Sequence, residues 1–159
     1  MSAILSSWIG FDNIKTLNPQ WDEKKFDVLC LPENIETEKS ANNLIESGEA
    51  IQLYKVLKGQ GITVLDLHDL GIKIPIYERR CNEIYFGTLF IKEIALQIVL
   101  GIVSTWIADK LFNSTVHIKL KIQKSEQIVS IIYDGDPETL KQILNSMARS
   151  ENDEHKKNG

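Results

Sequence analysis

Cysteine and positive charge are both scarce in this sequence, and each shortage excludes a class of protein. Cys30 and Cys81 are the only cysteines in 159 residues, and no metal-ligand spacing relates them, so neither a disulfide scaffold nor a zinc motif is indicated. The formal net charge is −4, whereas a dedicated duplex-DNA binder presents a dense basic surface to the phosphates. We therefore expect reduced thiols, no metal or cofactor, and a partner other than nucleic acid.

The chain also lacks a basic start and a hydrophobic run long enough to cross a bilayer. Residues 1–5 carry no positive charge, so the sequence predicts no secretory signal. The most apolar segment is free of charge only over residues 94–108, whereas a membrane span needs about 20 predominantly apolar residues. We expect a cytoplasmic protein in which this segment is buried or contacts another molecule.

The composition is that of a globular protein, and the first half has the pattern of a strand, a helix and a second strand. Hydrophobic residues make up 43% of the chain and charged residues 25%. Residues 26–31 are a short apolar run before Pro32, residues 49–58 are helical in pattern, and residues 62–67 form a second apolar run. This order is compatible with a βαβ unit that has two parallel strands. Residues 72–77 alternate like a strand, but Pro75 favours an extended connection.

The second half predicts a helix, a hairpin and a closing helix. Residues 86–112 are apolar around almost the whole circumference of a helix, which must then be surrounded by other elements. Residues 116–123 alternate between apolar and polar, and a short turn leads to residues 128–133, as in an antiparallel hairpin. Asp136 and Pro137 are placed to begin the closing helix.

The predicted fold class is α+β, with a small mixed sheet, a long apolar central helix, a C-terminal antiparallel hairpin and a closing helix. The predicted divisions are an N-terminal α/β subdomain at 1–83, a C-terminal α-ββ-α subdomain at 84–149, and a disordered tail at 150–159. One compact body is the alternative to two subdomains.

Asp66, His68 and Asp69 are the candidate catalytic residues. They follow a predicted strand, where a carboxylate could orient a histidine that acts as a general base. Such residues also cap turns, and neither a nucleophile nor a third metal ligand lies nearby in the sequence. Both readings remain open from the sequence alone.

Two charged groups could meet a partner. Glu78, Arg79 and Arg80 could form the edge of an interface, since paired guanidinium groups make forked contacts with anions. A basic strip on the exposed face of the hairpin could contact an acidic molecule or simply guard the strand edge. The strip consists of Lys119, Lys121 and Lys124.

The second half resembles small effector-associated or accessory domains of bacterial defence operons. The resemblance is carried by the helix at 90–111, the strands at 116–120 and 128–132, and the sequence Asp-Gly-Asp-Pro-Glu at 134–138. It implies a non-catalytic coupling role within a multi-protein system, and it transfers no functional residue.

The leading functional hypothesis is a non-catalytic interaction or accessory subunit that binds a protein partner or a second copy of itself. The alternative is a small enzyme or nucleotide-binding domain that uses Asp66, His68 and Asp69. For the leading hypothesis, apolar contacts are expected along the predicted central helix. The residues concerned are Phe90, Leu96, Leu100, Trp106 and Phe112.

Overall fold

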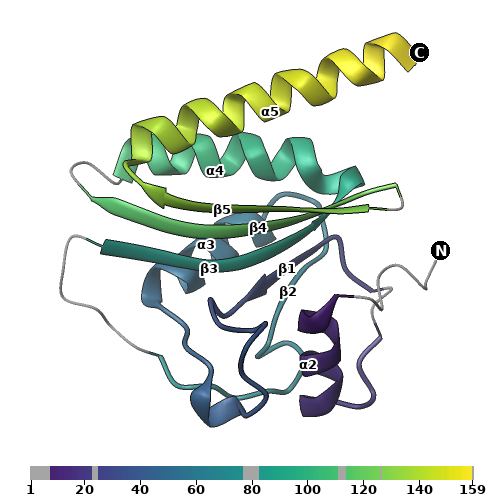
Figure 1. Ribbon diagram of the computed structural model, residues 1–159, viewed down its shortest axis with the longest axis vertical. Coiled ribbons are helices and arrows are strands. Elements are labelled where there is room, and N and C mark those ends of the chain that lie inside the picture. The colour runs from purple at the N-terminus through teal and green to yellow at the C-terminus, as the bar shows by residue number, and fades with distance from the viewer. Residues whose placement is uncertain (1–7, 23–24, 77–82, 111–113, 126, 159) are drawn as a thin grey trace.

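The computed structural model describes residues 8–22, 25–76, 83–110, 114–125 and 127–158. It has an α+β fold, built on one five-stranded mixed sheet in the order β2-β1-β3-β4-β5 (Figure 1). The parallel pairs are β1 with β2 and β3 with β4, and the antiparallel pairs are β1 with β3 and β4 with β5. The strands are β1 (Val28–Leu31), β2 (Val64–Asp66), β3 (Glu83–Lys92), β4 (Thr115–Lys124) and β5 (Gln127–Gly135).

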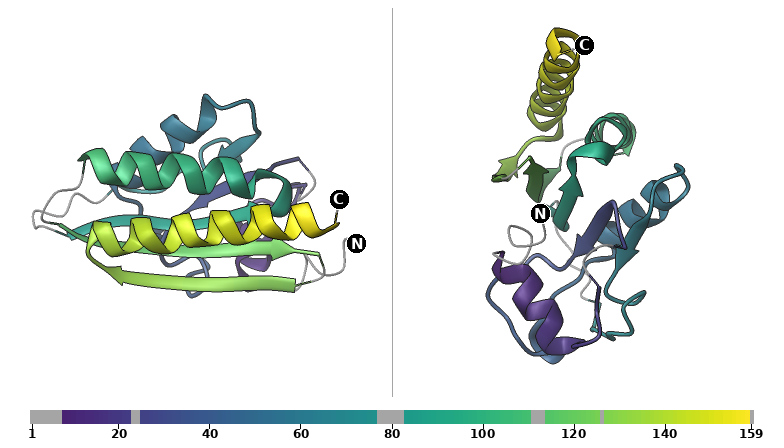
Figure 2. Two further views of the ribbon diagram at one scale, coloured as in Figure 1. Left: turned by 90° about the horizontal axis from the view of Figure 1, so that it is seen from above. Right: turned by 90° about the vertical axis from the view of Figure 1, so that its right-hand side faces the viewer.

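Helices cover both faces of this sheet. Helices α3 (Gly48–Lys58), α4 (Leu96–Lys110) and α5 (Pro137–Asn158) lie on one face, and α2 (Ile9–Leu17) lies on the other (Figures 1 and 2). Two short 3₁₀ helices, η1 (Ala41–Asn43) and η2 (Glu93–Ala95), lie in the connections. The sheet is therefore the middle layer of the protein, with a separate apolar core on each side.

The two cores differ in chemistry. Aliphatic side chains from α3, α4 and α5 fill the larger core. The core under α2 is rich in aromatic rings, with Phe90 of β3 at its centre. The Phe90 ring centroid lies 5.1 Å from that of Trp8, 4.7 Å from that of Phe11 and 5.9 Å from that of Phe26.

The predicted βαβ unit is confirmed. Strands β1 and β2 are parallel neighbours, and α3 connects them. The Ser47 hydroxyl caps α3 by accepting a hydrogen bond of 3.1 Å from the Ala50 amide, and it donates to the Tyr85 carbonyl of β3. The N-terminus of α3 is thereby fixed to β3, near the C-terminal ends of β1 and β2.

The predicted helix at 86–112 is wrong in its first part. Residues up to Lys92 belong to β3, and α4 begins only at Leu96. Strand β3 lies between two neighbours and is covered on both faces, so its residues form a continuous apolar run that periodicity cannot distinguish from a buried helix. Because β3 pairs with both β1 and β4, one sheet runs through both predicted subdomains.

The hairpin and the closing helix are confirmed, but the tail differs from the prediction. Strands β4 and β5 pair without a break in register, and the Asp136 carboxylate accepts a hydrogen bond of 2.8 Å from the Thr139 amide at the start of α5. The polar composition from Ser150 onward predicted a disordered tail, whereas α5 continues to Asn158. A helix that has already formed extends at little cost, because each added residue gains a backbone hydrogen bond.

The described helices include none that is long and apolar enough to cross a membrane. Helix α4, the most apolar of them, has 15 residues.

Candidate functional site

The structure brings Asp66 and Asp69 together at the end of β2, but their carboxylates are largely occupied. The Asp69 amide donates to Asp66 Oδ1 at 2.9 Å, and the Asp66 amide donates to Asp69 Oδ2 at 3.0 Å. Tyr54 of α3 donates its hydroxyl to the same Asp69 Oδ2 at 2.5 Å, and Lys58 Nζ lies 3.8 Å from Asp69 Oδ1. The pair therefore holds a turn against α3, which favours the turn-capping reading of these residues.

The two carboxyl groups respond differently to this environment. Burial raises the pKa of Asp66, with a further rise from the charge of Asp69. Burial would also raise the pKa of Asp69, but the hydrogen bonds from Tyr54 and from the Asp66 amide outweigh it and lower that pKa. Asp69 is thus the carboxyl group of the pair that loses its proton at the lower pH.

His68 contacts Glu46, a residue that was not singled out from the sequence. Glu46 is 6% exposed, and its Oε2 atom lies 3.4 Å from Nε2 of His68 without completing a hydrogen bond. Burial raises the pKa of Glu46, and His68 only partly opposes this rise. Nothing in the local sequence indicates this contact, because Glu46 lies 22 positions before His68 and is brought to it by the βαβ crossover.

We expect Glu46→Gln to increase the free energy of unfolding at neutral pH. A carboxyl group whose pKa is higher in the folded protein favours folding in its protonated form, so stability falls as the pH rises above the ordinary glutamate pKa of about 4.3. The gain from glutamine should disappear in acid, where the wild-type carboxyl group is itself protonated. Urea unfolding at a series of pH values measures this, with Glu38→Gln as the control, and an equal gain at all pH values contradicts it.

A second polar cluster lies on the other face of the sheet, around His117 of β4. Nδ1 of His117 lies 2.5 Å from Asp134 Oδ1 of β5, and Nε2 lies 3.5 Å from Glu83 Oε1 of β3. The imidazole stacks on the Tyr85 ring with a centroid distance of 4.3 Å. His117, Tyr85 and Asp134 line a hollow of about 210 Å³. His117 was expected on the solvent-exposed face of the hairpin, and the register that sets it opposite Asp134 is the signal that could have identified the pair.

The predicted basic strip is not an open surface in the structure. Lys121 is 7% exposed, lies 3.2 Å from Glu36 Oε1 and donates to the Ser130 hydroxyl. Lys119 donates to the carbonyl of Glu33 at 2.9 Å and is half-buried. The segment at 33–36 covers this part of the sheet, which alternation along one strand cannot reveal. Lys124, at the end of β4, is half-buried as well.

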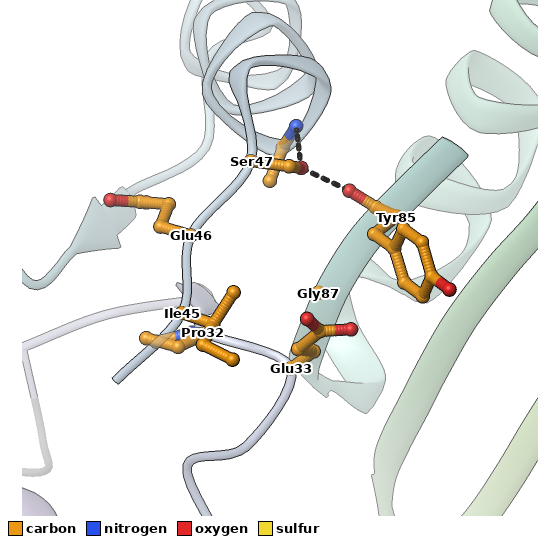
Figure 3. Close-up of a pocket in the computed structure, with 8 residues that line it drawn as sticks. Pro32, Glu33, Ile45, Glu46, Ser47, Tyr85 and Gly87 are labelled. Carbon is orange, nitrogen blue, oxygen red and sulfur yellow. Dashed lines mark hydrogen bonds between the residues drawn. The ribbon is translucent and has the colours of Figure 1, made fainter. Parts of the chain in front are cut away.

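The contact between α3 and β3 leaves a further depression that is too narrow for a ligand. Figure 3 shows Ser47 directed toward the Tyr85 carbonyl, while the Glu46 carboxylate points away from it. Pro32, Ile45 and Gly87 close the remaining sides, and the space has no room for a water molecule. We interpret it as a packing seam between the βαβ unit and β3.

The apolar residues predicted as an interface are divided between core and surface. Phe90, Leu96 and Leu100 are at most 2% exposed, so the expectation that they form a contact surface is wrong for this fold. Trp106 is half-buried and lines a shallow groove. Phe112, and likewise Glu78, Arg79 and Arg80, lie outside the described residues.

Two exposed isoleucines precede that groove along the chain, Ile94 in η2 and Ile98 in α4. Ile94 is 83% exposed and Ile98 is 39% exposed, one helical turn apart. The groove lies between α4 and α3, one helical turn further along α4 than Ile98, and measures about 320 Å³. Its lining consists of Val56, Gly101, Ile102, Thr105 and Trp106. We call Ile94, Ile98 and this lining the α4 face.

The described residues hold no group of three or more histidine, cysteine, aspartate or glutamate side chains that could bind a metal ion. Cys30 is buried, and burial together with the nearby carboxylates of Asp66 and Glu46 raises its pKa, so the thiol stays protonated and unreactive. The structure defines an α+β protein in which Asp66 and Asp69 are hydrogen-bonded within the chain, whereas Glu46 Oε2 and His117 Nε2 are buried without a hydrogen-bond partner. Comparison of the chain with protein-family models, with curated proteins and with solved structures gave no match.

Proposed function

We propose that this protein is a non-catalytic interaction module, an accessory subunit that binds a protein partner through the α4 face. The supporting observation is the exposure of Ile94 in η2 and Ile98 in α4, close along the chain to an apolar groove on the most apolar of the described helices. The resemblance of the second half to accessory domains of bacterial defence operons makes a multi-protein defence assembly the proposed setting.

The free energy of burying apolar side chains favours a partner on the α4 face. Full burial of an isoleucine side chain contributes about 1.5–3 kcal/mol, so the two exposed isoleucines could together anchor a contact. Trp106 is part of the lining of the shallow groove near them, and it is an aromatic residue of the kind enriched at the centres of protein interfaces. An amphipathic helix laid along α4 would bury apolar residues at helical spacing, in the manner of helix-in-groove recognition.

We expect Ile94→Glu with Ile98→Glu to abolish partner binding while leaving the fold intact. Both side chains are exposed, so the substitution costs little in folding but places two charges in the proposed contact. The measurement is purification of the tagged protein from its native host, with stoichiometric partners identified by mass spectrometry.

The matched control for this experiment is Ile9→Glu. Ile9 is 47% exposed and lies on α2, on the opposite side of the sheet. The proposal predicts a partner that is retained by the control and lost from the double variant. A partner that stays bound to the double variant contradicts the α4 face as its site.

A small enzyme is the second candidate, because Glu46 is a buried carboxyl group beside a half-exposed histidine. The side chain of His68 is 44% exposed, so a substrate could reach the imidazole that Glu46 contacts. In this alternative the pair, together with Asp66 and Asp69, would supply acid–base chemistry. His68→Ala discriminates between the two candidates, since an interaction module keeps its biological activity without this imidazole and an enzyme loses it.

A further inference from the structure

Strand β5 forms an open edge of the sheet along its whole length. It is the last strand in the sheet order, and among the described residues only β4 pairs with it. Its nine residues contrast with the three residues of β2 at the opposite edge. An edge strand exposes a row of backbone amide and carbonyl groups that can pair with another chain, and a short edge strand such as β2 exposes few of them. The long edge is the one that can accept another strand.

The usual protections of an edge strand are missing from β5. The sequence Gln-Ile-Val-Ser-Ile-Ile-Tyr-Asp-Gly contains neither proline nor lysine, and its register with β4 runs without a bulge. Its one charged residue is Asp134, which is paired with His117 of β4. The edge therefore carries a single carboxylate, which is already paired within the chain, and no kink that would repel an incoming strand.

Apolar side chains flank the open edge on both faces of the sheet. Ile132 is 64% exposed and Val129 is 38% exposed, and their alternation places them on opposite faces. Seen from above, α5 lies inward of β5 and leaves the strand at the outer margin (Figure 2). A strand added at this edge would bury both side chains and would form hydrogen bonds with the exposed backbone amide and carbonyl groups of β5.

We infer that a second copy of this chain occupies the edge, with β5 pairing antiparallel to β5 of the other copy about a two-fold axis at Ile131. This register pairs the full strand, because Ile131 is its middle residue. It sets Asp134 opposite Ile128 and Ser130 opposite Ile132, so no like charges face each other. Closed two-fold dimers are the commonest oligomers, and the pairing joins the two sheets into one.

The register makes a specific test possible through the facing positions 130 and 132. In the like-charge variant, Ser130→Glu with Ile132→Glu, each new carboxylate at position 130 faces another at position 132 of the other copy, and the dimer should dissociate. In the opposite-charge variant, Ser130→Glu with Ile132→Lys, the same positions attract each other, and the dimer should re-form. A carboxylate at position 130 can still accept from Lys121, so both variants keep that contact within the chain. Far-UV circular dichroism checks that both variants are folded.

Light scattering coupled to size-exclusion chromatography measures the outcome over a range of concentrations. The wild type and the opposite-charge variant are expected at twice the chain mass of 18.1 kDa, and the like-charge variant at the chain mass. A wild type that stays monomeric, a like-charge variant that stays dimeric, or a failure of the opposite charges to restore the dimer each overturns the inference. Ile94→Glu with Ile98→Glu should remain dimeric, which separates this contact from the proposed partner site on the α4 face.

Discussion

Gly87→Ala is expected to lower the free energy of unfolding by about 2 kcal/mol or more, because both the backbone and the surroundings of this residue exclude a side chain. Gly87 has a φ of 78°, in the left-handed region. A Cβ atom there would lie 2.4 Å from the carbonyl oxygen of Leu31, which belongs to the neighbouring strand β1. The register of β3 against β4 also shifts at this point, between Tyr85 and Thr88.

The matched control is Gly101→Ala on α4. A Cβ atom at Gly101 meets nothing within 4 Å, and alanine is favoured over glycine within a helix by about 1 kcal/mol. Thermal or urea unfolding of the two variants should therefore give changes of opposite sign. If Gly87→Ala were as stable as the wild type, the close approach of β1 to β3 would be contradicted.

Phe90→Ala is expected to cost about 3–5 kcal/mol, as is typical when a buried phenylalanine is truncated. The ring is fully buried and packs against Trp8, Phe11 and Phe26, so its removal leaves a cavity that the sheet behind it cannot close. The loss is large relative to the roughly 5–15 kcal/mol that is usual for the stability of a whole domain. Urea unfolding followed by tryptophan fluorescence measures it, because Trp8 stacks on this ring.

Ile94→Ala is the companion to this substitution. Ile94 is 83% exposed, and its truncation should change stability by less than about 0.5 kcal/mol. Unchanged stability of Phe90→Ala, combined with altered association, would return Phe90 to the surface role that the sequence analysis gave it.

The sequence predicted those elements whose signals are local. The hairpin of β4 and β5 shows alternation, and Asp136 followed by Pro137 marks a helix start, so both were found within a residue or two of their observed bounds. The βαβ unit was found because a capped helix separates two short apolar runs. Strand β3 was missed because its residues are apolar on both sides, and only the pairing with β1 and β4 determines that they are extended.

The candidate site was less predictable, because its contacts join distant parts of the chain. Asp66 and Asp69 were identified as residues of interest, and their reciprocal hydrogen bonds favour a role in holding the turn. Glu46 was missed because its burial depends on where the βαβ crossover returns. The α4 face was predicted in part: the apolar helix was expected to be covered by other elements or a partner, and Trp106 was named as a contact residue, but Ile94 and Ile98 were not. Which of its residues stay exposed follows from the positions of α3 and α5, and these are set by the tertiary structure.

The isoleucine side chains allow the proposed interaction to be tested directly. Exposed isoleucines lie on several separate surfaces, among them Ile94 and Ile98 on the α4 face, Ile9 on α2 and Ile132 on β5. Methyl NMR spectra of the protein, recorded while the captured partner is added, report on all of these surfaces at once. The account predicts that the methyl signals of Ile94, Ile98 and Ile102 shift while that of Ile9 does not. Shifts confined to Ile9, or to other isoleucines remote from α4, would contradict the α4 face as the binding site.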